Sequence, residues 1–194
     1  MKKVIIPVVL VTLVAFVAYK FFYKKESSEQ QKEIPLTVST NDSLTGNVGG
    51  ALQAYYNLKD AFVKSDTSLV NKEASVFIEK IAQVETGDIK ADAAIVELAG
   101  QLKQNLANET NNLVTTKELE PKRKVFQVIS DQLFDFLRTI GYQGSTVYQQ
   151  FCPMAFENNG AAWLSNTTEI SNPYFGSKML HCGDVRDSIF TAKK

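Results

Sequence analysis

Residue types that carry metal or thiol chemistry are scarce in this chain. Its 194 residues include only two cysteines, one histidine, one tryptophan and three methionines. The cysteines do not form a CxxC pair, which disfavours a zinc site. Apart from the initiator Met1, all of these rare residues lie between Cys152 and Cys182. Any chemistry of the protein is therefore expected in this short segment.

The chain also lacks an excess of charge of either sign. It has 21 basic and 21 acidic side chains, so its formal net charge is zero. A nucleic-acid-binding protein needs a basic stripe to meet phosphates, and none occurs outside the first 25 residues. The run Lys122-Arg123-Lys124 lies beside Glu118 and Glu120 and is expected to form a solvated helix start. No nucleic-acid partner is expected.

The long apolar run is at the N-terminus, within residues 1–25, and lysines flank it. Such a segment is either a signal peptide or an uncleaved membrane anchor. Cleavage after Ala15 or Ala18 would place a bulky residue at the −3 position, which favours an anchor that spans the membrane through residues 4–23. No cysteine lies near the run, which excludes a lipoprotein anchor. We expect a periplasmic domain tethered to the inner membrane, with a cleaved, secreted form as the alternative.

Residues 26–47 are polar and predict a flexible linker. From Val48 to Gly141, apolar residues recur at helical spacing and define four amphipathic segments. Their apolar faces contain Leu52, Tyr55, Leu58 and Phe62; Val70, Ala74, Phe77, Ile78, Ile81 and Val84; Ile95, Leu98, Ala99, Leu102 and Leu106; and Phe126, Ile129, Leu133, Phe136, Leu137 and Ile140. Four such helices with short connections predict an antiparallel bundle with these aromatic residues in its core.

Local signals predict several helix boundaries. Asp66 is a plausible N-cap of the second helix, and the polar stretch 108–116 is expected to connect the third and fourth. Thr115 and Glu118 have the spacing of a capping box at the start of the fourth helix. Gly141 is expected to end that helix.

After Gly141 the helical period stops. Short strands or extended pieces are expected at 147–151, 162–164 and 178–180, and this segment is expected to dock on the bundle through Trp163 and Phe175. The fold class is therefore mainly α: an antiparallel four-helix bundle followed by a small irregular or short-β C-terminal segment, with an N-terminal membrane anchor. The helical domain covers residues 48–190, and its Cys/Met/His segment covers residues 142–190.

The two ends of the rare-residue segment suggest a metal site. Thiolate and thioether sulfur select Cu(I), and imidazole also suits copper. Residues two apart on an extended chain share a face, which would align Cys152 with Met154 and Met179 with His181. Cys182 would point away unless the turn at Gly183 rotates it. The expected cargo is copper as Cu(I), with these five residues as candidate ligands.

A disulfide is the alternative. In an oxidising compartment two cysteines in one domain usually pair, and a Cys152–Cys182 bridge would contribute roughly 3 kcal/mol to stability. Met154 and Met179 would then be core residues and His181 a satisfied polar residue, or the three would form a weaker methionine-rich copper site. Catalysis is not expected, because His181 and Cys182 are adjacent and no motif supplies an oxyanion hole.

The sequence also resembles a bacterial family of uncharacterised extracytoplasmic domains. The likeness rests on YYxLKDA at 55–61 and on a series of C-terminal motifs: CPMAF at 152–156, GAAWLS at 160–165, NPYFG at 172–176 and MLHCG at 179–183. In that family the domain also occurs on periplasmic adaptors of copper/silver-type heavy-metal efflux pumps. The resemblance implies a role in copper or heavy-metal handling, with an efflux adaptor or another envelope protein as partner.

The motif Cys152-Pro153-Met154 is also similar to the short heavy-metal-binding domain of those adaptors. That domain has Cys-Pro-Met-His-Pro and a second cysteine pair. Here Ala155 stands where the histidine would be, and only Cys182 follows. A zinc-ribbon-like site with four ligands is therefore not expected.

Overall fold

The computed structural model describes residues 42–190. The predicted anchor at 1–25 and most of the predicted linker lie outside these residues. None of the helices formed by residues 42–190 has the length and apolar character of a membrane-spanning segment.

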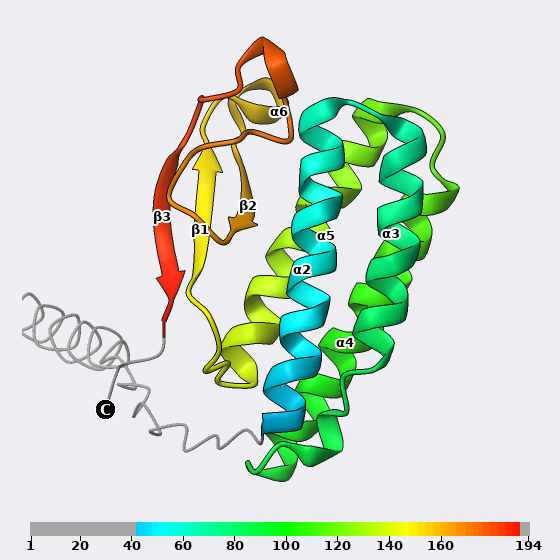
Figure 1. The fold of residues 1–194 in the computed structure, drawn as a ribbon, viewed down its shortest axis with the longest axis vertical. Helices are drawn as coiled ribbons and strands as arrows, with labels where there is room; N and C mark the ends of the chain where they lie inside the picture. The colour runs from blue at the N-terminus through cyan, green and yellow to red at the C-terminus, as the bar shows by residue number, and fades with distance from the viewer. Residues whose placement is uncertain (1–41, 191–194) are drawn as a thin grey trace, which may run out of the picture. The chain divides into compact units, whose positions relative to one another are not determined.

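Four long helices lie side by side in the bundle (Figure 1). They are α2 (Asp42–Lys64), α3 (Thr67–Ala82), α4 (Ala93–Thr115) and α5 (Leu119–Thr139), and a 3-10 turn, η1 (Thr86–Asp88), follows α3. The prediction of a mainly helical domain is confirmed. Helix α2 begins at Asp42, so the last residues of the predicted linker belong to this helix, and Leu44 is buried in the core.

Two predicted helix boundaries are confirmed. The Asp66 carboxylate accepts a hydrogen bond from the Leu69 amide at 2.9 Å, as an N-cap residue does. Gly141 follows α5 with a φ of 58°, a backbone conformation that glycine adopts without strain.

The predicted connector at 108–116 is wrong, because α4 continues to Thr115. The side chains of Thr110 and Asn111 donate hydrogen bonds to carbonyls four residues earlier in the helix, and Thr110 and Leu113 are buried. The predicted capping box is wrong as well. Thr115 donates its hydroxyl to the Asn112 carbonyl, and Glu118 is the N-cap of α5 without a side-chain hydrogen bond.

Aromatic rings fill the centre of the bundle, as predicted. The Tyr55 and Phe126 rings stack with centroids 5.3 Å apart, and Phe62 lies 4.6 Å from Phe126. Phe77 contacts Tyr55 edge-on. Three residues of the predicted apolar faces lie outside the core: Leu98 is 47% exposed, and Ile78 and Ile95 are only partly buried.

The prediction of a solvated start for α5 is wrong for two of its three basic residues. Lys122 and Arg123 are buried. The Lys122 ammonium donates to the Asn71 side chain at 2.7 Å and to the Leu113 carbonyl, and burial lowers its pKa. The sequence signal misled because long basic side chains can be buried when their heads find acceptors in neighbouring elements.

A three-stranded antiparallel sheet covers one side of the bundle (Figure 1). Its strands are β1 (Val147–Cys152), β2 (Ala161–Ser165) and β3 (Asp184–Ile189), in the order β2-β1-β3. Strand β2 packs against α5 and α2. The predicted strands at 147–151 and 162–164 are confirmed.

The predicted extended piece at 178–180 is wrong, because this region forms a 3-10 turn, η2 (Gly176–Lys178), followed by a further turn. The third strand instead comes from 184–189. Its sequence was not informative, since this edge strand is mostly exposed and carries charged residues in place of an apolar alternation.

Candidate functional site

The two cysteines lie next to each other at one end of the sheet. Cys152 ends β1, and Cys182 lies two residues before β3, which pairs with β1. Their sulfur atoms are 2.9 Å apart. Cys152 is buried and Cys182 is partly exposed, and both are free thiols. The antiparallel pairing of β1 with β3 therefore brings together two residues that are thirty positions apart.

Asn172 closes the loop that presents Cys182. Its side-chain amide donates to the Cys182 carbonyl at 2.8 Å, and its side-chain oxygen accepts from the amides of Tyr174 and Phe175. Its own backbone amide donates to the Leu180 carbonyl. Asn172 is buried, so these bonds form away from water and fix the shape of the loop.

Gly183 permits the close approach of this loop to the sheet. It has a φ of 142°, and a Cβ atom at this position would lie 2.8 Å from the Phe151 carbonyl oxygen and 2.9 Å from the Trp163 ring. A larger residue would push the chain away from β1. The backbone conformation at Gly183 therefore orients Cys182 toward Cys152. This is the condition under which Cys182 was expected to join the site.

The thiol of Cys182 is protonated at neutral pH. The hydrogen bond with Cys152, together with desolvation, raises the pKa of Cys182 to about 11, and a hydrogen bond from the Met154 backbone acts in the opposite direction. A thiol with such a pKa is a poor nucleophile near pH 7. It remains a possible metal ligand, because a bound cation displaces the proton.

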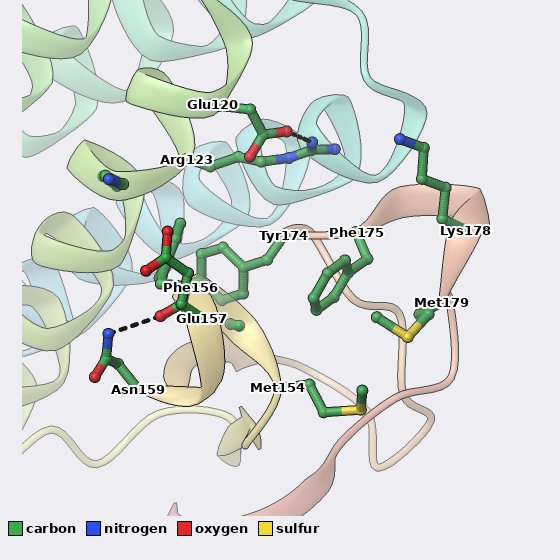
Figure 2. A pocket seen from close by; sticks show the side chains of 12 residues that line it. Glu120, Arg123, Met154, Phe156, Glu157, Asn159, Tyr174, Phe175, Lys178 and Met179 are labelled. Atoms are coloured by element: carbon green, nitrogen blue, oxygen red, sulfur yellow. Dashed lines mark hydrogen bonds and ion pairs between the residues drawn. The ribbon is translucent and has the colours of Figure 1, made fainter.

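Met154 and Met179 line a pocket that does not include the cysteines. The pocket has a volume of about 620 Å³ and lies between the start of α5 and the C-terminal segment. Figure 2 shows both methionine side chains on the same side of the pocket, below Phe175. Met154 is 48% exposed. The loop that includes α6 (Ala155–Asn158) forms another wall.

His181 does not line the methionine pocket. It is exposed, and its Nδ1 atom lies 3.0 Å from the Ile170 carbonyl oxygen. The structure thus divides the five predicted ligands into a cysteine pair, a methionine pair and a surface histidine. Within residues 42–190, no group of three or more His, Cys, Asp or Glu side chains is placed to hold a metal ion.

The predicted docking aromatics have different roles. Trp163 is buried and meets the Tyr174 ring edge-on, with centroids 5.9 Å apart. Its indole N–H has no hydrogen-bond partner in the described part of the chain. Phe175 is only partly buried and lines the methionine pocket.

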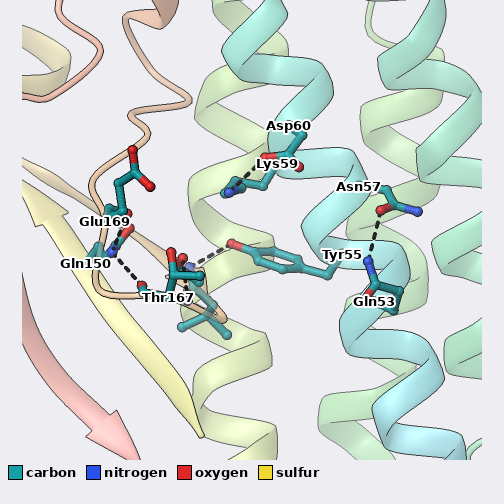
Figure 3. Close-up of polar contacts among 10 residues, drawn as sticks. Gln53, Tyr55, Asn57, Lys59, Asp60, Gln150, Thr167 and Glu169 are labelled. Carbon is teal, nitrogen blue, oxygen red and sulfur yellow. Dashed lines mark hydrogen bonds and ion pairs between the residues drawn. The ribbon is translucent and has the colours of Figure 1, made fainter. Parts of the chain in front are cut away.

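Tyr55 is an organising residue whose role the sequence analysis did not predict. Its hydroxyl lies 2.6 Å from the Ser130 hydroxyl on α5 and accepts a hydrogen bond from the Leu164 amide on β2 at 3.0 Å (Figure 3). Burial raises its pKa well above the usual value, so the phenol stays neutral. Its position in the apolar face of α2 predicted burial, but no local signal identified its partners.

Gln150 anchors the loop after β2 in a similar way. Its side-chain amide donates to the carbonyls of Thr167 and Glu169, as Figure 3 shows. Gln150 is buried, and β1 has an irregular register at this position. These bonds hold the start of the loop that leads to Asn172.

Residues 51–144 match the model of a family described as a protein of unknown function (DUF3347). The matched part covers most of α2, all of α3, α4 and α5, and stops before β1. It supports a helical domain of an uncharacterised family, and it does not extend to the cysteines or methionines. No match to the chain was found among curated proteins or among solved structures.

Proposed function

We propose that this protein is a non-catalytic, membrane-tethered periplasmic domain that binds Cu(I) or Ag(I) through Cys152 and Cys182. The 2.9 Å contact between the two sulfur atoms carries this proposal. Two thiolates side by side form a soft ligand pair, which suits a soft monovalent cation. The resemblance to domains found on efflux adaptors supports a role in heavy-metal efflux or copper handling, with an adaptor or another envelope protein as partner.

The cysteine pair requires a small movement to take up an ion. Metal–thiolate bonds of about 2.3 Å, the length found in zinc sites, place two bound sulfurs roughly 4 Å or more apart. The sulfurs must therefore separate by about 1 Å. We assign this movement to the Cys182 side chain, because it is partly exposed, whereas Cys152 is buried at the end of a strand.

Titration of the reduced, full-length chain with Cu(I) against a competing chelator tests the proposal. We expect one ion whose binding requires both thiols, so Cys152→Ser and Cys182→Ser should each weaken binding by at least a hundredfold. Affinity should rise with pH, because the Cys182 proton must leave. His181→Ala is the control, since this exposed imidazole contacts the Ile170 carbonyl and forms no three-residue ligand group with the cysteines within residues 42–190. Equal affinity in the cysteine variants and the wild type would disprove the proposal.

A structural domain with a Cys152–Cys182 disulfide is the second candidate. The same sulfur contact supports it, because oxidation of the two thiols needs little movement. The bridge would close a loop of about 30 residues and stabilise the fold by roughly 3–4 kcal/mol in the chain-entropy model. In this form the domain would serve as an interaction module of the cell envelope, and metal would have no role at the cysteines.

Thiol quantification on protein isolated from the periplasm separates the two candidates. Two reactive thiols after denaturation without reductant would exclude the disulfide form. No reactive thiols before reduction and two afterwards would favour it. The sample should be denatured during labelling, because Cys152 is buried in the folded protein.

A further inference from the structure

We propose that the pocket lined by Met154 and Met179 is a second soft-cation site, which binds Cu(I) or Ag(I) through two thioethers without the cysteines. The inference rests on the proposed function in that it assumes the same class of cargo. It differs from the proposed function in its ligands, which are the two thioethers, and in its position, which is the pocket. The domain would accordingly take up two ions in its reduced form and one in its disulfide form.

The placement of the two methionines carries this inference. Both line the same pocket of about 620 Å³, and neither cysteine lines it. Figure 2 shows the two thioethers on the same side of the pocket, although one comes from the turn after β1 and the other from the turn after η2. Methionine is normally a core residue, yet Met154 is 48% exposed. Its sulfur lone pairs can therefore reach an ion from solvent.

The other residues of the pocket favour a soft ion over a hard one. Phe156, Tyr174 and Phe175 form apolar walls, and the Tyr174 hydroxyl donates to the Ala162 carbonyl. The remaining side-chain oxygens of the lining belong to Glu120, Glu157 and Asn159, fewer than the roughly six or more oxygens of a calcium site. The Glu120 carboxylate is paired with the Arg123 guanidinium. Hard cations need several oxygen ligands, whereas thioethers select Cu(I) or Ag(I).

The charge of the pocket limits the affinity of this site. Lys124 and Lys178 lie on its border together with Glu157. The thioethers are neutral, so the bound ion keeps its full positive charge close to these two lysines. We therefore infer weak, exchangeable binding, which suits a site where an ion enters before it reaches the thiols.

The position of Met154 connects the two sites. It follows Cys152 by two residues, and its backbone donates a hydrogen bond to Cys182. An ion bound to the Met154 sulfur is thus held by a residue only two positions from Cys152 along the chain. Transfer to the thiols would release protons, whereas binding to the thioethers releases none, because a thioether has no proton to lose.

Silver(I) is the probe for the test, since it does not change oxidation state during the titration. The full-length Cys152→Ser/Cys182→Ser chain, carrying methionine labelled with ¹³C in the ε-methyl group, is titrated with Ag(I) and observed by NMR. We expect the Met154 and Met179 signals to shift together, while the Met1 signal serves as the internal reference. Affinity should change less than twofold between pH 5.5 and 7.5. Met154→Leu and Met179→Leu, added singly, should each weaken binding at least tenfold.

The outcomes separate this inference from the proposed function. Unshifted Met154 and Met179 signals, or equal affinity after the leucine substitutions, would overturn the thioether site and leave the thiol site intact. Shifted methionine signals with no thiol-dependent binding in the wild type would overturn the thiol site alone. The oxidised wild-type chain is a second background without thiolates, in case the double serine variant does not fold.

Discussion

At the scale of single residues, the contact between Cys182 and Cys152 sets the reactivity of the partly exposed Cys182 thiol. In the reduced protein the pKa of Cys182 is raised to about 11, chiefly by the hydrogen bond with Cys152. The thiolate fraction at pH 8 is then on the order of one in a thousand, and it should rise about tenfold per pH unit up to pH 10. Cys152→Ala removes the contact and should lower this pKa toward the ordinary value of about 8.5.

Alkylation by iodoacetamide, followed by peptide mass spectrometry, measures this effect. We expect Cys182 in the Cys152→Ala variant to react more than tenfold faster than in the wild type at pH 8. Met154→Ala is a suitable control, because it keeps the backbone amide that bonds to Cys182. A wild-type rate that stops rising below pH 9 would contradict the assigned pKa.

Tyr55 is a single residue that joins three elements, because its hydroxyl on α2 bonds to α5 and to β2. Tyr55→Phe removes the hydroxyl that bonds to Ser130 and to the Leu164 amide, both buried. We expect a loss of about 1–3 kcal/mol in the free energy of unfolding, because the Leu164 amide is left without a partner. Urea denaturation measures it. Tyr56→Phe is the matched control: the Tyr56 hydroxyl makes no hydrogen bond within residues 42–190, so a loss below about 0.5 kcal/mol is expected.

At the scale of elements, the helices could be predicted because their apolar spacing is local information. The error at 108–116 has a physical reason: Thr110 and Asn111 satisfy their polar groups with carbonyls of the same helix, so polar composition did not mean a break. Strand β3 could not be predicted. It is held by pairing with β1, and its own side chains are largely exposed. Non-local pairing of this kind leaves no pattern in the strand itself.

The turn at α6 contains three residues with a strained backbone, which the sequence also does not reveal. Phe156, Glu157 and Asn158 all have positive φ values, between 51° and 67°. This left-handed conformation costs about 1–2 kcal/mol for a residue with a side chain. Glu157→Gly should therefore stabilise the protein by about 0.5–1 kcal/mol, after the greater freedom of glycine in the unfolded chain is deducted.

Thermal or urea denaturation of two variants checks this prediction. Glu157→Ala removes the same carboxylate but keeps a Cβ atom, so its stability should stay within about 0.5 kcal/mol of the wild type. The difference between the glycine and alanine variants then isolates the backbone strain. Equal stability of the two would show that the turn is not strained at Glu157.

At the scale of the whole molecule, the candidate site could be predicted only in part. The concentration of rare residues predicted a site in the segment from Cys152 to Cys182, and the structure places these two cysteines side by side as free thiols. The separation of the methionines from the cysteines could not be foreseen, because it depends on the turn at 176–181 and on the Asn172 bonds that shape it. The predicted alignment of Met179 with His181 requires an extended chain there, because residues two apart share a face only in such a chain.

The site also depends on the docking of the C-terminal segment onto the helices. Buried Arg123 on α5 donates hydrogen bonds of 3.0 Å to the Pro173 carbonyl and to the Ser65 hydroxyl. Pro173 precedes Tyr174, whose ring contacts Trp163. Because Trp163 is the one tryptophan of the chain, its fluorescence reports on the docked sheet, while far-UV circular dichroism reports on the helices. The two signals should change at the same urea concentration in the wild type, as expected for one cooperative unit.

Arg123→Ala should uncouple the unfolding of the sheet from that of the helices. It leaves the Pro173 carbonyl without its donor, and we expect a loss of about 2–4 kcal/mol and a fluorescence transition that precedes the helical one. Arg138→Ala is the matched control, because Arg138 forms an exposed ion pair with Asp187 that contributes less than about 1 kcal/mol. Coincident transitions in Arg123→Ala would mean that Tyr55 and the apolar contacts of β2 are enough to couple the sheet to the bundle. The cysteine and methionine sites would then keep their geometry without the Arg123 bonds.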